Sequence, residues 1–280
     1  MKTAVITGAS TGIGYATTAR LLNADFHVFG SVRNEADANR LQRSFGRQFT
    51  PLIFDVTDEA GIKQAVGLVR EALKGKTLDV LINNAGIAVS GPLQFVPLEK
   101  FKLQLDVNVI GLLAVTQAFL PLLGGIQERK ENPGRIINIS SVSGVFVTPF
   151  MGPYCASKFA LEAMNDAMRR ELELYGIKVV SVQPGPIKTE IWRKAKEDDT
   201  SYPDTIYQPF LEKRSKIIDK RSKNALPVED VANLLYKITI HKSPKTRYLI
   251  APNSLQIKFI RLLPDRWADQ LIFKLFLSAK

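Results

Sequence analysis

The chain has 280 residues, 45% hydrophobic and 23% charged, with a formal net charge of +11. These values are typical of one folded α/β domain with additions, and they exclude a disordered chain. A disulfide scaffold is excluded as well, because Cys155 is the only cysteine, and we expect a reducing compartment.

The positive charge is compatible with nucleic acid, anionic lipid or a polyanionic cofactor. Zinc-finger and aromatic ribonucleoprotein motifs are absent from the sequence, so we predict no nucleic-acid partner. We find no secretion signal at the first residues and no run of about 18 apolar residues. We therefore expect a cytoplasmic protein, soluble or peripherally associated with a membrane.

Seven short runs rich in Val, Ile and Leu alternate with helical stretches, which predicts an α/β fold. We expect a single doubly wound parallel sheet of the Rossmann type, with helices on both faces. The runs are residues 3–8, 27–33, 50–56, 78–86, 134–141, 177–185 and 247–252. Residues 1–253 would form the catalytic domain, with a polar substrate-lid insertion at about 189–224. A basic amphipathic extension would follow at 254–280.

The first run is followed by TGASTGIG, in which Gly8, Gly12 and Gly14 open a helix. Glycines in that place allow a tight turn and let a pyrophosphate lie against the helix N-terminus. Three glycines can also simply make a turn. The position directly after the first strand favours a dinucleotide site.

The second run ends in GSVRN, where proteins that bind NAD usually place a carboxylate on the ribose. Ser31 and Arg33 occupy this region, and an arginine accepts a 2′-phosphate that a carboxylate would repel. NADP(H) is therefore favoured over NAD(H). Thr11 lies in the turn where a basic residue would add a second phosphate contact. Asp55, after the third strand, either binds the adenine amino group or caps a helix with Thr57.

Polar side chains follow the fourth and fifth runs. INNAG carries Asn83, Asn84 and Gly86, either a polar patch against an adenosine or a stabilising turn. Asn108 lies in an otherwise apolar helix, where it marks a helix irregularity or holds a water. Ser140 and Ser141 stand where the fifth strand ends, at the edge where such sheets bind ligands.

In YCASK, Tyr154 and Lys158 are four positions apart and share one face of a helix. The lysine ammonium is expected to lower the pKa of the phenol and bring it toward the range of general acid-base catalysis. An amphipathic pair with the lysine in water is the alternative for an arbitrary Tyr-x-x-x-Lys.

Together these motifs resemble the short-chain dehydrogenase/reductase family: TGASTGIG, NNAG, NVIG, the serine thirteen residues before YCASK, and PGPIKT. The resemblance spans roughly residues 3–190. It implies that Tyr154 is the acid-base residue, Lys158 its partner and ribose ligand, Ser141 the residue that orients the reacting oxygen, and Asn108 the holder of a relay water. The cofactor residues implied by the motifs are Gly8, Ser10, Thr11, Gly12, Ile13, Gly14, Ser31, Arg33, Asp55, Val56, Asn84, Ala85, Gly86, Tyr154, Lys158, Pro184, Gly185, Ile187 and Thr189. Gln183 departs from the family pattern, where Asn or Arg is frequent.

The helix after YCASK and the TRYLIAP stretch are similar to the branch of 17β-hydroxysteroid and retinol dehydrogenases. This implies an NADP(H)-dependent oxidoreductase that interconverts an alcohol and a ketone or aldehyde on an apolar, steroid-, retinoid- or lipid-like substrate. We expect Ser141, Val145, Phe150, Met151 and Trp192 at the substrate and no metal site. A redox sensor without turnover, a general small-carbonyl reductase and an anion- or membrane-binding protein are the alternatives. Family likeness implies a dimer or tetramer. The C-terminal tail would contact a membrane, cover the pocket or pack on another subunit.

Overall fold

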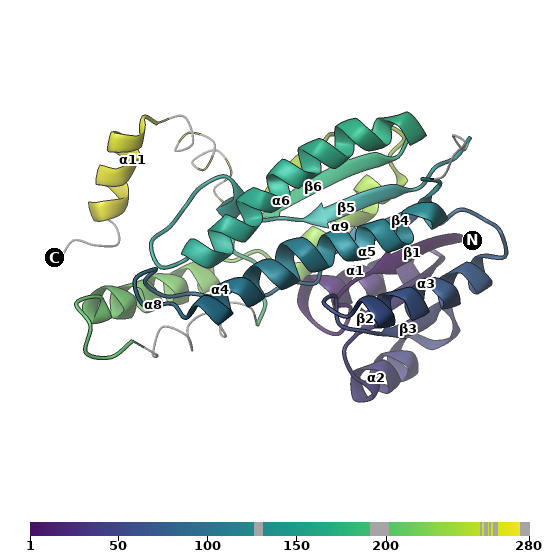
Figure 1. Ribbon diagram of the computed structural model, residues 1–280, viewed down its shortest axis with the longest axis horizontal. Helices are drawn as coiled ribbons and strands as arrows, with labels where there is room; N and C mark the ends of the chain where they lie inside the picture. Colours follow the sequence, from purple (N-terminus) through teal and green to yellow (C-terminus); the bar gives the residue numbers. More distant parts are fainter. Residues whose placement is uncertain are drawn as a thin grey trace.

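The computed structural model describes residues 1–125, 131–190, 202–252, 254, 257, 259 and 263–274 (Figure 1). Seven parallel strands form one sheet in the order β3-β2-β1-β4-β5-β6-β7. The strands are β1 (Lys2–Ile6), β2 (Phe26–Val32), β3 (Phe49–Ile53), β4 (Val80–Asn83), β5 (Arg135–Ile139), β6 (Lys178–Pro184) and β7 (Arg247–Ile250). The predicted doubly wound sheet is confirmed.

The sheet is buried on both faces, because alternate residues of a strand point to opposite faces and pack against different helices. On one face Ala4 and Ile6 pack with helices α1 (Gly12–Leu22), α2 (Glu35–Phe45) and α9 (Val228–Ile240). On the other face Val5 packs with α3 (Glu59–Leu73), α5 (Leu112–Phe119) and α6 (Gly152–Glu171). This two-sided burial explains why the strands read as continuous apolar runs.

A long helical stretch crosses the second face in several short pieces. It begins with α4 (Leu98–Leu105), continues through the π-helical turn η2 (Asp106–Gly111) into α5, and ends in the 3₁₀ turn η3 (Leu120–Leu123). Residues Leu98–Leu123 are long and apolar enough to cross a membrane by length and composition alone. Val115 and Phe119 are fully buried in the core, as in a helix that covers a sheet.

The order β3-β2-β1-β4 reverses the direction of chain progress between β1 and β4. Helix α1 leaves β1 on one face and α5 follows β4 on the other, so the two connections diverge there and open a crevice at the strand ends. Short 3₁₀ turns complete the domain at η1 (Gly46–Gln48), η4 (Val142–Gly144) and η5 (Leu172–Tyr175).

Helices α8 and α11 lie outside this frame (Figure 1). Helix α8 (Gln208–Lys223) belongs to the predicted lid and packs Leu211 against Val89 and Phe150. Helix α11 (Asp265–Ile272) belongs to the C-terminal extension, has no buried residue, and stands away from the sheet.

Candidate active site

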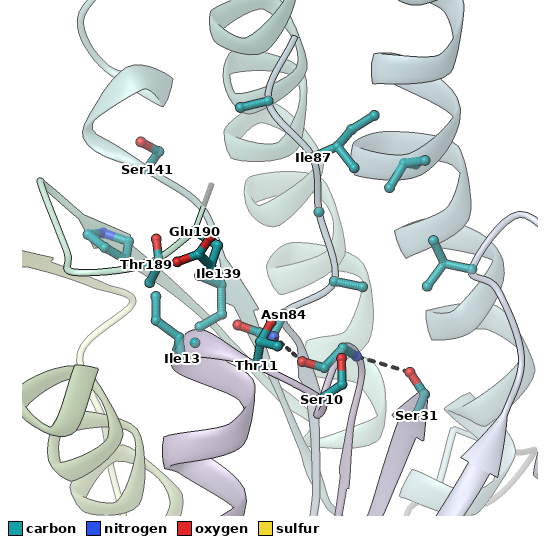
Figure 2. Close-up of a pocket in the computed structure, with 18 of the residues that line it drawn as sticks. Ser10, Thr11, Ile13, Ser31, Asn84, Ile87, Ile139, Ser141, Thr189 and Glu190 are labelled. Carbon is teal, nitrogen blue, oxygen red and sulfur yellow. Dashed lines mark hydrogen bonds between the residues drawn. The ribbon is translucent and has the colours of Figure 1, made fainter. Parts of the chain in front are cut away.

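A cavity of about 340 Å³ opens at the carboxyl ends of the strands, around the crevice between β1 and β4 (Figure 2). Its wall is built by the segments that follow six of the strands. Among the predicted cofactor residues, all except Gly14 line it: Gly8, Ser10, Thr11, Gly12, Ile13, Ser31, Arg33, Asp55, Val56, Asn84, Ala85, Gly86, Tyr154, Lys158, Pro184, Gly185, Ile187 and Thr189. Residues from distant parts of the sequence are thus brought to one edge of the sheet.

The glycine turn is closed tightly against the strand beside it. Gly8 has φ +68°, and a Cβ on Gly14 would lie 2.1 Å from the Gly8 carbonyl oxygen. Gly14 therefore allows the turn to pack closely on the first turn of α1, because only a residue without a side chain fits there. The Asn84 side-chain amide donates to the carbonyl oxygens of Thr7 (2.9 Å) and Gly8 (3.1 Å). Asn84 thus fixes the turn to the end of β4, as Figure 2 shows.

The N-terminus of α1 faces the cavity with features that suit an anion. Thr11 occupies the N-cap position and makes no side-chain hydrogen bond to the helix. The first amides of α1 consequently have no cap from that side chain, and the helix dipole favours negative charge there. The close turn, the uncapped amides and Arg33 at the same edge together fit a dinucleotide phosphate.

The second strand supplies the residues that would distinguish the two dinucleotides. The Ser31 hydroxyl accepts a hydrogen bond from the Gly8 amide (3.0 Å), so it shapes the turn (Figure 2). Arg33 is exposed on the cavity wall and has no ion-pair partner among the described residues. Arg40 on α2 donates to the Ser10 carbonyl oxygen (2.9 Å) and pairs with Asp37. A second cation therefore lies beside the turn, although Thr11 supplies none.

Asp55 lies on the wall with its carboxylate partly engaged. Its Oδ1 accepts hydrogen bonds from the Thr57 amide (2.9 Å) and the Thr57 hydroxyl (2.7 Å). Asp55 thus pairs with Thr57, but it does not cap a helix, which was the alternative considered from sequence. The N-cap of α3 is Asp58.

Three of the four predicted catalytic side chains, those of Ser141, Tyr154 and Lys158, meet on the wall nearest α6. Tyr154 and Ser141 both line the cavity, and the Ser141 side chain is close enough to the phenol to lower its pKa. Lys158 Nζ donates to the Ile139 carbonyl oxygen (2.8 Å) and lies 5.8 Å from the centre of the Tyr154 ring. A phenol beside a hydroxyl and an ammonium can pass a proton to an oxygen atom held at Ser141.

The pKa of Tyr154 does not shift in the expected direction. Burial raises it to about 12, and the hydrogen bond from Ser141 only partly opposes this rise. Burial also lowers the pKa of Lys158 to about 8, against the opposing effect of Glu162. The net lowering of the phenol pKa that was expected is therefore not found in this arrangement. The physical reason is that burial of the phenol outweighs a cation whose Nζ is bonded to a backbone carbonyl.

Asn108 lies inside the π-helical turn η2, so the helix irregularity considered from sequence is present. Its side chain bonds both backbone groups of Ile87, accepting from N (2.9 Å) and donating to O (3.0 Å), and it also donates to Ser157 Oγ (3.1 Å). Ser157 in turn donates to the Tyr154 carbonyl oxygen (2.7 Å). Asn108 therefore ties the segment after β4 to the catalytic helix.

Of the predicted substrate residues that the structure describes, Ser141 lines this cavity and Val145, Phe150 and Met151 do not. Phe150 and Met151 are buried beside it, Phe150 with the lid residues Tyr202 and Leu211, and Met151 with Tyr154. Val145 is half-buried after η4. Trp192 lies outside the described residues.

Several side chains that shape the site gave little signal in the sequence. Gln104 donates to the Ile87 carbonyl and its Oε1 accepts from the Val89 amide, and its position four before Asn108 was the available clue. Arg40 was one of many surface cations. Asn83 points inward to Thr116 and Asn138 instead of lining the cavity.

Comparison with known proteins agrees with this geometry. A family model described as short chain dehydrogenase matches residues 2–200. An NADPH-dependent 3-dehydrocapnine reductase from Ornithobacterium rhinotracheale is 44% identical over 275 residues, covering 98% of this chain and 97% of that protein. A 3-ketodihydrosphingosine reductase from Bacteroides thetaiotaomicron is 32% identical over 264 residues, covering 93% of each chain. A short chain dehydrogenase from Burkholderia cenocepacia, solved with NADP, shares the fold with a TM-score of 0.72 and 24% identity, covering 99% of this chain and 100% of that one.

Proposed function

Because the chain belongs to the short-chain dehydrogenase/reductase family, we propose that it is an NADPH-dependent reductase acting on a ketone of a long-chain lipid. The observation that carries this proposal is that Tyr154, Ser141 and Lys158 lie together on the wall of a cavity suited to a dinucleotide. A redox sensor without turnover would need no such acid-base group.

NADPH, when bound, would supply the hydride that reduces the carbonyl carbon. Ser141 would hold the carbonyl oxygen through its hydroxyl, and the Tyr154 phenol would give that oxygen its proton. The pKa of about 12 keeps Tyr154 protonated at neutral pH, which suits a proton donor in the reductive direction. Lys158 would stabilise the phenolate left behind and be held in place by the Ile139 carbonyl.

The names of two relatives support a lipid ketone as substrate. The names 3-dehydrocapnine reductase and 3-ketodihydrosphingosine reductase both describe reduction at position 3. The first of these relatives matches the chain almost from end to end, including the lid and the C-terminal extension.

The proposal is tested by following NADPH oxidation with long-chain 3-ketones, with retinal and ketosteroids, and with small aldehydes and diketones. We expect kcat/KM for the long-chain 3-ketone to exceed that for the small carbonyls by at least about tenfold. Equal turnover of small carbonyls would indicate a general carbonyl reductase. Binding of NADPH with no oxidation of any carbonyl would favour the sensor.

Arg33 is expected to set the preference for NADPH, because its guanidinium is the exposed cation on the wall at the end of β2. In the variant Arg33→Asp, the carboxylate should repel a 2′-phosphate and accept ribose hydroxyls instead. We expect the ratio of kcat/KM for NADPH to that for NADH to fall by about 10²-fold or more. Steady-state kinetics with both cofactors measures this ratio, with Arg43→Asp, at an exposed position of α2 that does not line the cavity, as the charge-matched control. An unchanged ratio would place the 2′-phosphate elsewhere, for example at Arg40.

We also propose that the protein forms a homo-oligomer. Exposed apolar side chains lie on adjacent helices, with Leu103 on α4, Ile110 on η2 and Phe159 on α6 exposed by 50%, 59% and 43%. Covering such side chains is a common reason for subunit association. Light scattering in solution gives the mass, and a strictly monomeric mass would refute the proposal.

The C-terminal extension is proposed to contact lipid. Trp267 and Leu271, four residues apart on α11, are 65% and 45% exposed, and Phe273 follows at 57%. An apolar helix face flanked by Arg266 and Lys274 suits an anionic membrane interface. The protein should co-sediment with vesicles containing phosphatidylglycerol, and Trp267→Ser should weaken this binding. Equal sedimentation of both proteins would contradict the role given to α11.

A further inference from the structure

One wall of the cavity is a stretch of chain that has left the sheet. Strand β4 ends at Asn83, and residues 84–90 belong to no helix or strand, although Ile87 and Ala88 line the cavity. Backbone amides and carbonyls removed from water need partners, because leaving them unpaired is costly. With no neighbouring strand to pair with, this wall takes partners from side chains, and Gln104 of α4 is one of them.

Gln104 is fully buried near the C-terminal end of α4. Its Oε1 accepts a hydrogen bond from the Val89 amide (2.7 Å), and its Nε2 donates to the Ile87 carbonyl oxygen (3.0 Å). These two backbone groups lie on either side of Ala88, which packs against the apolar cluster that contains Tyr154. One side-chain amide therefore fixes the wall where it faces the catalytic helix.

The same amide also reaches the catalytic helix itself. Gln104 Nε2 donates to Ser157 Oγ (3.3 Å), and Ser157 donates to the Tyr154 carbonyl oxygen (2.7 Å). Asn108 donates to the same hydroxyl oxygen but bonds only Ile87 in the wall. Gln104 is thus the side chain that connects Val89 with the turn of α6 that carries the phenol.

The donors and the acceptor of this amide are all used between two walls of the site. We infer that Gln104 is a positioning residue for the reduction, which holds the wall of Ile87 and Ala88 in a fixed place relative to the Tyr154 phenol. This inference rests on the proposed function. The ketone must lie between that wall, the phenol and the cofactor, and a displacement of about 1 Å can cost a reaction about 10²-fold.

The test is the variant Gln104→Met, which keeps the length of the side chain and removes its hydrogen bonds. We expect kcat for the long-chain 3-ketone, measured per bound NADPH, to fall about 10- to 100-fold, with KM changed by less than about threefold. Counting bound NADPH restricts the measurement to folded protein, so a loss of stability alone leaves kcat unchanged. Gln117→Met, at an exposed position of α5, should keep wild-type kcat.

A second variant covers the case in which Gln104→Met does not fold. Gln104→Asn keeps a polar amide in the buried position but is one methylene too short to reach both Val89 and Ile87. Its kcat should also fall at least about tenfold with KM little changed. Wild-type kcat in either folded variant would show that Gln104 has a structural role only and would overturn the inference.

Hydrogen exchange tests the position of the wall without any turnover. In the variants, the peptide that contains the Val89 amide should exchange at least about tenfold faster than in the wild type, whereas peptides of α5 should be unchanged. Unchanged exchange at Val89 would also overturn the inference. If the wild type reduces none of the ketones, the reductase proposal fails, and the exchange measurement alone decides whether Gln104 holds this wall.

Discussion

Replacement of Tyr154 by phenylalanine is expected to lower kcat for ketone reduction by about 10²- to 10⁴-fold, the usual contribution of a positioned general acid. The variant loses the one hydroxyl that pairs with Ser141 and keeps the ring that packs with Met151. Its free energy of unfolding should therefore change little. The measurement is single-turnover reduction of the long-chain 3-ketone at saturating NADPH, together with the dissociation constant of NADPH.

Tyr175→Phe is the matched control, because it removes a phenol from the opposite end of the same helical segment, far from the cavity. It should keep wild-type kcat. A Tyr154→Phe protein that retains more than about a tenth of wild-type kcat would assign proton transfer to another group. Loss of NADPH binding together with kcat would instead indicate that the phenol acts mainly on the cofactor.

The sequence was sufficient to predict the sheet and the residues at its edge. The strands are continuous apolar runs, and parallel order then forces every strand end to the same side. Gly8, Arg33, Asn84, Ser141 and Tyr154 are separated by up to 146 residues, yet all lie on one cavity wall. Local patterns and one topological rule therefore bring them together.

Burial and partner choice could not be predicted from the sequence. Tyr154 and Lys158 share a helix face as expected, but the depth of that face decides the direction of both pKa shifts. Asn84 was expected near an adenosine, and its amide is already bonded to the glycine turn. Arg214 on α8 belongs to a helix with many cations, and only its packing distinguishes it from Lys216.

A network on α6 connects the catalytic lysine to the last strand. Glu162, one turn after Lys158, accepts hydrogen bonds from Ser181 (2.6 Å) and Arg247 (2.9 Å). Burial raises the pKa of Glu162, but these hydrogen bonds hold it below its usual value. The carboxylate therefore stays negative and keeps the pKa of Lys158 from falling further than about 8.

Replacement of Lys158 by methionine should reduce activity and at the same time remove a pH-dependent cost to stability. A lysine whose pKa falls from 10.5 to about 8 on folding binds more protons in the unfolded chain between these values. Stability of the wild type therefore rises with pH through this window. Burial raises the pKa of Tyr154 from 10 to about 12. Titration of this phenol therefore lowers the free energy of unfolding only above pH 10. Relative to Lys158→Met, the wild type should gain about 2 kcal/mol between pH 7 and pH 9.5.

Urea unfolding of both proteins without cofactor gives the free energy of unfolding at pH 7 and at pH 9.5. The gain is the change between the two pH values in the wild type minus the change in Lys158→Met. The titration of Cys155 and of surface groups is common to both proteins and cancels in this subtraction. Lys63→Met, at an exposed position of α3, should run parallel to the wild type at both pH values. The Ile139 carbonyl lines the cavity, so water can replace the lost Nζ donor and the substitution leaves no sealed polar group. If Lys158→Met shows the same pH dependence as the wild type, folding does not lower the pKa of Lys158, and the lysine stays charged in the folded protein. The ammonium would then be free to lower the phenol pKa as the spacing in YCASK first indicated.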